Sequence, residues 1–131
     1  APEGWHVPSD AEWTTLENYL IANGYNYDGT TTENKIAKAM ASTTGWNSST
    51  TAGAPGNDQS LNNSSGFNAF PEGVRDYVGS FSVNGANAIF WGSTEHDISA
   101  AWYHRLLVGS PELFSWHYSK LFGHSVRFVR D

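Results

Sequence analysis

Three of the five histidines of this chain lie close to its carboxyl end, at His104, His117 and His124. Neutral imidazoles are frequent zinc ligands, so histidines on neighbouring strands could converge on a metal ion. Their spacing argues against a site of this kind, because no two histidines are two or four residues apart and no HExxH sequence occurs. We therefore expect no metal ion here, with these imidazoles on the surface or half-buried.

The segment STEHD places hydroxyl, carboxylate and imidazole groups side by side, as a hydrolase would need. In an extended segment, however, Thr94 and His96 point to one face of a sheet while Ser93, Glu95 and Asp97 point to the other. A nucleophile needs its base within hydrogen-bond reach, which adjacency in sequence does not provide. No GxSxG turn is present either. We expect no catalytic residues, with Thr94 and Glu95 fixing the end of a strand through hydrogen bonds.

The polar stretch GNDQSLNNSSG, at residues 56–66, offers many oxygen atoms of the kind that calcium prefers. Only Asp58 brings a formal charge, and the ligand order of an EF-hand with its closing Glu is missing. Two interpretations stay open. Either this loop holds a structural calcium ion, or its side chains are bonded to its own backbone. The sequence indicates no other cofactor.

Two helices are predicted in the first third of the chain. Ser9 and Glu12 have the spacing of a capping box, and apolar residues follow at helical intervals. This pattern predicts a helix over residues 9–23. A second helix is predicted over residues 32–42, where Glu33 lies in the first turn and the helix dipole favours its charge.

A long loop is predicted over residues 43–68, where the composition changes to Gly, Ser, Thr, Asn and Asp. Loops of this length are uncommon in small domains unless they are functional or internally packed. Trp46 and Phe67 are the large apolar residues near its two ends. We expect them to anchor the loop.

Short apolar segments bounded by Gly, Pro, Ser or Asp follow Pro71 and predict strands. The predicted strands lie around residues 89–91, 101–108, 113–118 and 124–130, with reversals at 109–112 and 120–123. Two helices followed by an antiparallel meander imply an α+β fold with the helices on one side of the sheet.

The strand AWYHRLLV carries large apolar residues on both of its faces. Alternation places Trp102, His104 and Leu106 on one face and Tyr103 and Arg105 on the other. Either the strand is buried on both sides, or one face is a recognition surface, where aromatic side chains provide contact area at low conformational cost. We favour the recognition surface, because His104 and Arg105 lie in the middle of the strand.

Composition excludes several classes of protein. The length of 131 residues suits a single domain. A net charge of -6 without a Lys/Arg cluster argues against binding to nucleic acid. No apolar run is long enough for a membrane span, and no signal-peptide pattern is present. The absence of cysteine excludes disulfides, thiolate metal sites and thiol catalysis.

Six motifs together resemble one protein family. In order, they are PEGWHVPSDAEWTTLENYL, STTGWNSST, GAPGNDQSLNNSSGFNAFPEG, FWGSTE, AWYHRLL and HSVRFVRD. Over nearly its whole length the chain resembles the Fibrobacter succinogenes major paralogous domain. This resemblance implies a C-type lectin-like fold, related to that of formylglycine-generating enzymes, with two helices, a long loop region and a twisted antiparallel sheet. It also implies that residues 1–131 are one such domain, forming the C-terminal part of a longer secreted or surface protein.

Some members of this family resemble the variable proteins of diversity-generating retroelements, in which adenine-specific mutagenesis changes chosen codons near the carboxyl end. Between FWGSTE and SVRFVRD, where family members often carry Asn, Tyr and Ser, this chain contains no Asn. The resemblance thus implies a variable, ligand-binding surface. Its candidate residues are His96, Asp97, Ile98, His104, Leu106, Val108, Pro111, Leu113, Ser115, Trp116, His117, Tyr118, Leu121 and His124.

Two departures from the related families bear on function. Ala1 and Phe128 stand where family members often carry Cys, and the catalytic cysteines of formylglycine-generating enzymes have no counterpart. The Glu-Pro-Asn and Trp-Asn-Asp motifs of calcium-dependent lectins are also absent. We therefore expect neither that enzymatic activity nor calcium-mediated binding of sugars.

We predict a non-enzymatic ligand-binding domain, extracellular, at a cell surface or on a phage particle, whose partner is a protein or glycan at a cell surface. The main alternative is a carbohydrate-binding module, in which Trp102, Trp116 or Tyr118 stacks on a sugar ring. A second is an oxidase-type enzyme, which copper or calcium in a closed cleft with His104 and His117 would indicate. A third is a structural spacer, for which the tail should be buried.

Overall fold

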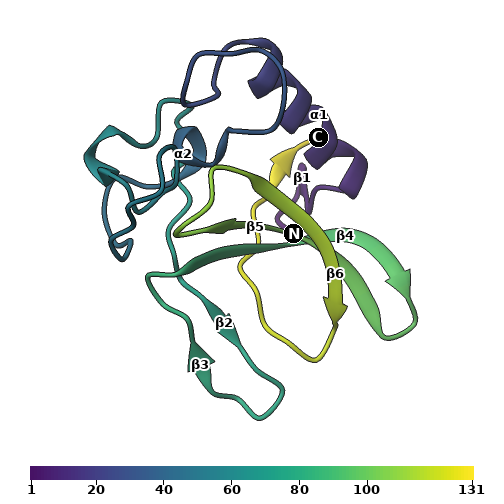
Figure 1. Ribbon diagram of the computed structural model, residues 1–131. Helices are drawn as coiled ribbons and strands as arrows, with labels where there is room; N and C mark the ends of the chain where they lie inside the picture. The colour runs from purple at the N-terminus through teal and green to yellow at the C-terminus, as the bar shows by residue number, and fades with distance from the viewer.

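A computed structural model of residues 1–131 shows two helices beside three small antiparallel sheets (Figure 1). The helices are α1 (Asp10–Ala22) and α2 (Ala37–Met40). The strands are β1 (Trp5–His6), β2 (Val74–Arg75), β3 (Phe81–Ser82), β4 (Asn87–Asp97), β5 (Ala100–Leu107), β6 (Leu113–Ser119) and β7 (Val129–Arg130). The α+β class with two helices and antiparallel sheets is confirmed.

Helix α1 begins at the predicted capping box. The Ser9 hydroxyl accepts from the Glu12 amide at 3.2 Å, and the Glu12 carboxylate accepts from the Ser9 amide at 2.8 Å. Gly24, just beyond the helix, has a φ of 81°, in the left-handed region that favours glycine. The buried side of α1 carries Trp13 and Leu20. Neither helix has the length and apolar character that crossing a membrane requires.

We expect Ser9→Ala to lower the free energy of unfolding by about 1 kcal/mol, because one amide at the start of α1 loses its acceptor. Urea denaturation measures this loss. Thr15→Ala is the control, since the exposed Thr15 hydroxyl donates only to a backbone carbonyl one turn earlier. It should change stability by less than about 0.5 kcal/mol. Equal losses in the two variants would contradict the role of the cap.

The second helix is much shorter than predicted, and its expected first turn does not form. Glu33 has a φ of 64°, in the left-handed region that a helix cannot use. The buried Asn26 side chain holds this backbone: its amide donates to the Thr32 and Glu33 carbonyls, and its oxygen accepts from the Lys35 amide. These groups are thereby withdrawn from helical hydrogen bonds, so the prediction of a helix over residues 32–42 is wrong outside α2.

The predicted long loop is confirmed, with only a 3-10 turn at Gln59–Leu61 inside it. Trp46 is buried, and Phe67 packs against the core, as expected of the two anchors. The Gln59 side chain brackets the Trp46 backbone, accepting from its amide at 3.0 Å and donating to its carbonyl at 3.2 Å. The loop is thus internally packed.

A lysine of α2 binds the oxygen atoms that the sequence offered to calcium. The Lys38 ammonium donates to the carbonyls of Asn57 and Asp58 and to the Asn62 side-chain oxygen. The Asn62 side chain in turn donates to the backbone carbonyls of Ser42 and Pro55. A calcium ion bound through these oxygens would have to displace the Lys38 ammonium.

The main sheet has the order β4-β5-β6, and all its strands are antiparallel. His104 in the central strand pairs with Phe90 of β4 and Ser115 of β6. Helix α1 lies beside this sheet and contacts β4 and β5 (Figure 1). Its Trp13 ring contacts the rings of Phe90 and His104. The helix therefore lies on the sheet as predicted, and the part of β5 around His104 and Leu106 that faces it is core.

The last predicted strand, over residues 124–130, does not continue the meander. Ser125 instead forms a parallel bridge beside β4, donating to the Ile89 carbonyl and accepting from the Trp91 amide, both at 3.0 Å. Only Val129–Arg130 forms a strand, β7, and it pairs with β1. The chain leaves the edge of the sheet because its two ends pair with each other.

Candidate functional site

The fourteen predicted ligand-binding residues do not form one surface. The exposed ones are His96, Asp97, Ile98, Ser115, Trp116, Tyr118 and Leu121. The half-buried ones are Val108, Pro111, His117 and His124, and the buried ones are His104, Leu106 and Leu113. The exposed residues lie at the end of β4, in the β4–β5 turn, in β6 and just after β6.

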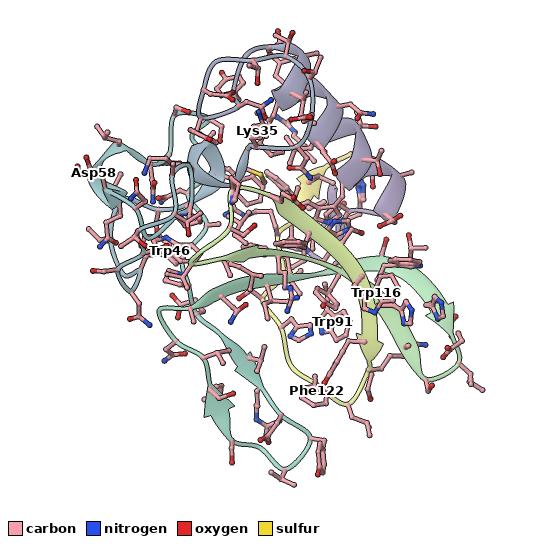
Figure 2. The ribbon with its side chains drawn as sticks, viewed as in Figure 1. Lys35, Trp46, Asp58, Trp91, Trp116 and Phe122 are labelled. Atoms are coloured by element: carbon pink, nitrogen blue, oxygen red, sulfur yellow. The ribbon has the colours of Figure 1, made fainter.

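Four rings lie together at this end of the sheet, and we call them the aromatic cluster: His96, Trp102, Trp116 and His117. The imidazoles of His96 and His117 stack with centroids 3.6 Å apart and planes 9° apart. The Trp116 ring stacks on His117 at 4.7 Å. The Trp102 ring meets the other three edge to face, at 5.4 to 6.3 Å. Figure 2 shows Trp116 on β6, beside the end of β4.

Strand pairing brings these rings together. Trp102 of β5 and His117 of β6 are directly paired, so their side chains share a face. The register of β4 against β5 shifts between Trp91 and Glu95 and again before Asp97. Irregularities of this kind redirect side chains. They occur where His96 turns toward His117.

Asp97 orders the turn that follows β4. Its carboxylate accepts from the Ser99 amide and hydroxyl and from the Ala100 amide, and it lies 3.0 Å from the Nδ1 of His96. The Ser99 amide, the His96 ring and the Ser99 hydroxyl hold the pKa of Asp97 far below its usual range. Asp97 is therefore ionised and fixes His96 in place.

Hydrogen bonds confirm the structural roles predicted for Thr94 and Glu95. The Thr94 hydroxyl accepts from the Asp10 amide at 2.9 Å and so ties β4 to the start of α1. The Glu95 carboxylate pairs with the Lys120 ammonium at 2.7 Å. Lys120 also donates to the Ile98 carbonyl. These contacts connect the β4–β5 turn to the end of β6.

Three of the predicted residues are core, which corrects the expectation of a recognition surface along β5. His104 is 2% exposed and stacks on Trp13 at 4.6 Å. Its Nε2 lies 3.1 Å from an Asp10 oxygen but lacks hydrogen-bond alignment, and burial lowers its pKa to about 4. Leu106 and Leu113 belong to the same hydrophobic core. The central strand is covered by α1, so these side chains are not displayed.

The three histidines near the carboxyl end do not converge. His104 lies in the core, His117 in the aromatic cluster, and His124 packs on Trp91 at 4.2 Å. His124 also lies 5.7 Å from Tyr103, which alternation places on the sheet face opposite to His104. No group of three or more metal-ligating side chains lies together anywhere in the chain.

Two further predicted residues anchor other segments by their backbones. The Val108 carbonyl accepts from the Gly56 amide of the long loop, and the Pro111 carbonyl accepts from the Ala37 amide of α2. Both lie at the other end of β5 and β6. They are remote from the aromatic cluster in the sheet.

Trp102 belongs to the aromatic cluster but is not among the fourteen candidate residues, although the carbohydrate alternative named it. Alternation had placed it on the face of His104, and pairing with β6 decides that it meets His117. The sequence indicated Trp102 through its position two residues before His104, on the same face of the strand and closer to the β4–β5 turn. Extending the site along that face would have included it.

The profile of one protein family matches nearly the whole chain. That family is described as the Fibrobacter succinogenes major domain, and the match covers residues 1–130. It confirms the family resemblance that the six sequence motifs indicate. No curated protein and no solved structure matches the chain.

Proposed function

The chain belongs to the Fibrobacter succinogenes major domain family, and from this membership we propose that it is a non-enzymatic recognition domain with a C-type lectin-like fold. The pairing of β1 with β7, near the two ends of the chain, supports this fold. So do the two helices and the long packed loop. The ligand is a protein at a cell surface, and the domain acts outside the cell or on a phage particle.

The exposure of the aromatic cluster carries this proposal. Trp116 is 58% exposed, and the nearby Ile98 and Leu121 are 92% and 74% exposed. Exposed apolar groups that gather at one place are typical of interaction sites, and Trp and Tyr are enriched in such interfaces. Stacking and strand pairing already hold the rings, so little side-chain freedom is lost on binding.

The polar groups near the aromatic cluster support a non-enzymatic role. The hydroxyl of Thr94 and the carboxylates of Glu95 and Asp97 are each engaged in contacts that hold the strand ends. The imidazoles of His96 and His117 stack on each other instead of facing a hydroxyl nucleophile. Binding here needs no covalent step, because burial of the rings supplies the free energy.

We expect Trp116→Ala to weaken binding at least about 30-fold, the loss typical of a tryptophan hot spot. The purified domain is titrated onto bacterial surface fractions, with and without prior digestion of the fractions by protease. Trp5→Ala is the matched control, because Trp5 is also exposed but lies in β1. Protease-sensitive binding that needs Trp116 and not Trp5 is expected. Equal binding by the two variants would refute the role of the cluster.

A carbohydrate ligand is the second candidate, and the exposed Trp116 ring favours it, because indole faces stack on sugar rings. A glycan array distinguishes the two candidates. Binding to defined glycans that is lost in Trp116→Ala would replace the protein ligand by a sugar. Protease-resistant binding to the surface fractions would point the same way.

We propose in addition that the displayed residues are diversified by a retroelement. The absence of Asn between FWGSTE and SVRFVRD supports this, as does the exposure of seven of the fourteen candidate positions. The neighbouring genes provide the test. A reverse transcriptase and a near-copy of the 3′ coding segment, differing mainly at adenines, are expected there. Their absence would remove the diversification and leave the binding proposal in place.

A further inference from the structure

A cleft of about 210 Å³ opens on the sheet face opposite to α1. Ile89, Tyr103 and Arg105 form its floor, since alternation turns them away from the core residues between them. One wall is formed by Val74 of β2 and by Val83, which directly follows β3. The opposite wall includes Tyr118 and Phe122, and Figure 2 shows Phe122 near the end of β6.

Buried polar atoms without partners are concentrated in this cleft. They are the side-chain oxygen of Asn87, the Nε of Arg105 and both ring nitrogens of His124. Buried polar groups in folded proteins almost always have hydrogen-bond partners, and leaving them unpaired costs stability. Three such residues around one cavity indicate polar groups prepared for a ligand.

Arg105 carries a charge that no protein group neutralises. It takes part in no ion pair and in no side-chain hydrogen bond, and its guanidinium lies over the rings of Tyr103 and Phe114, at 5.8 and 5.7 Å. The planar fork of a guanidinium matches the two oxygens of a carboxylate. A carboxylate would therefore fit Arg105 in both charge and shape.

The other two polar residues define the rest of the ligand. The Asn87 oxygen can only accept, so it needs a donor, which the N–H group beside a carboxylate could supply. Burial lowers the pKa of His124 to about 4, so at neutral pH its ring offers one donor and one acceptor. Between these groups the cleft is lined mainly by apolar side chains, including Ile89 and Phe122.

We propose that this cleft binds an apolar α-amino acid residue through its free α-carboxylate. The carboxylate pairs with Arg105, the adjacent N–H donates to Asn87, and the side chain packs among the rings. The volume is below the roughly 300–1,000 Å³ of sites for larger ligands, which suits a single residue. The carboxyl end of a peptide and a free amino acid share this chemistry. The site includes none of the four residues of the aromatic cluster, so it goes beyond the recognition function proposed above.

Calorimetry and amide NMR of the folded domain test this proposal with N-acetyl-L-phenylalanine, its C-terminal amide and free L-phenylalanine. We expect saturable binding of the acid, at least tenfold weaker binding of the amide, and shifts at Ile89, Tyr103 and Phe122. Preference for the acetylated acid over free phenylalanine indicates a peptide end, and the reverse preference indicates a free amino acid. Arg105→Gln should reduce affinity at least tenfold, whereas Arg130→Gln, an exposed arginine of β7, should not change it.

Several outcomes would overturn the proposal. These are no binding of either acid, equal binding of acid and amide, unchanged affinity in Arg105→Gln, or shifts confined to Trp102 and Trp116. If Arg105→Gln fails to fold, the comparison of acid with amide on the unaltered protein still decides, because it varies only the carboxylate. Failure here would leave the role of Trp116 in surface binding unaffected.

Discussion

Acidification from pH 6.5 to pH 4.5 is expected to remove several kcal/mol of stability from this domain. Burial lowers the pKa of His104 and of His124 from 6.5 to about 4. In the unfolded chain both imidazoles take up protons near their ordinary pKa, whereas in the folded protein they stay neutral. Acid therefore favours the unfolded chain.

The sign follows from proton counting. Between pH 6.5 and about 4 the unfolded state binds more protons than the folded state, so stability falls as the pH falls. Each histidine contributes about 1.4 kcal/mol per pH unit in this window, and the two together about 2.7 kcal/mol. Small domains are stable by roughly 5–15 kcal/mol in total, so this is a large share.

Other groups with shifted pKa values oppose the slope or add to it only at the edges of this window. Hydrogen bonds from the Ser9 amide and the His6 ring lower the pKa of Glu12, which adds a slope of the same sign near the lower end. Hydrogen bonds to Asp131 and Glu12 raise the pKa of His6 in the folded protein. The stability that His6 adds is therefore fully present below pH 6.5, and it is lost only as the pH rises through this raised pKa. Hydrogen bonds lower the pKa of Asp28 to about 2, and its contribution is lost only at more acidic pH than this window covers. Burial raises the pKa of Glu17, which gives a slope of opposite sign over the lower part of the window.

Urea denaturation at pH steps between 7.5 and 4.5 measures the slope. His104→Phe and His124→Phe keep a ring against Trp13 and Trp91 and remove the titrating nitrogens, which have no aligned partners. Each variant should lose about half of the slope, and the double variant nearly all of it. A slope unchanged in the double variant would show that these histidines do not cause acid unfolding.

Local sequence signals predicted the parts of the fold that local interactions determine. The capping box of Ser9 and Glu12 gave the start of α1, and alternating apolar segments gave β5 and β6 to within about one residue. The prediction of the second helix was wrong over its first turns, because the Asn26 side chain, several residues earlier, binds the backbone around Glu33. That competition is a tertiary contact, and no helical pattern reveals it.

Tertiary contacts also limited how well exposure of the candidate site residues could be predicted. Alternation correctly separated His104 from Tyr103, but it does not tell which face of β5 meets α1. That choice depends on where Trp13 packs, far away in the sequence. Trp116 and Ile98 are exposed, and their role in binding stays a prediction.

We expect Trp46→Ala to lower the free energy of unfolding by about 3–5 kcal/mol, the usual cost of removing a large buried ring. Trp46 is 4% exposed and belongs to the main hydrophobic core, although it opens a long polar loop. The loop backbone depends on it, because Gln59 binds both the amide and the carbonyl of this residue. Losing the ring should therefore also loosen the loop, and limited proteolysis within residues 43–68 should become faster.

Trp46→Phe separates packing from hydrogen bonding in this anchor. The indole nitrogen of Trp46 is buried without a partner, so its N–H contributes no hydrogen bond that phenylalanine would lose. Phe should therefore retain much of the stability, with a loss of about 1–2 kcal/mol for the smaller ring. Urea denaturation and proteolysis rates compare both variants with the exposed Trp5→Ala. If Trp46→Ala proved as mild as Trp5→Ala, the loop would be held by its polar contacts, with Lys38 and Asn62 as the remaining anchors.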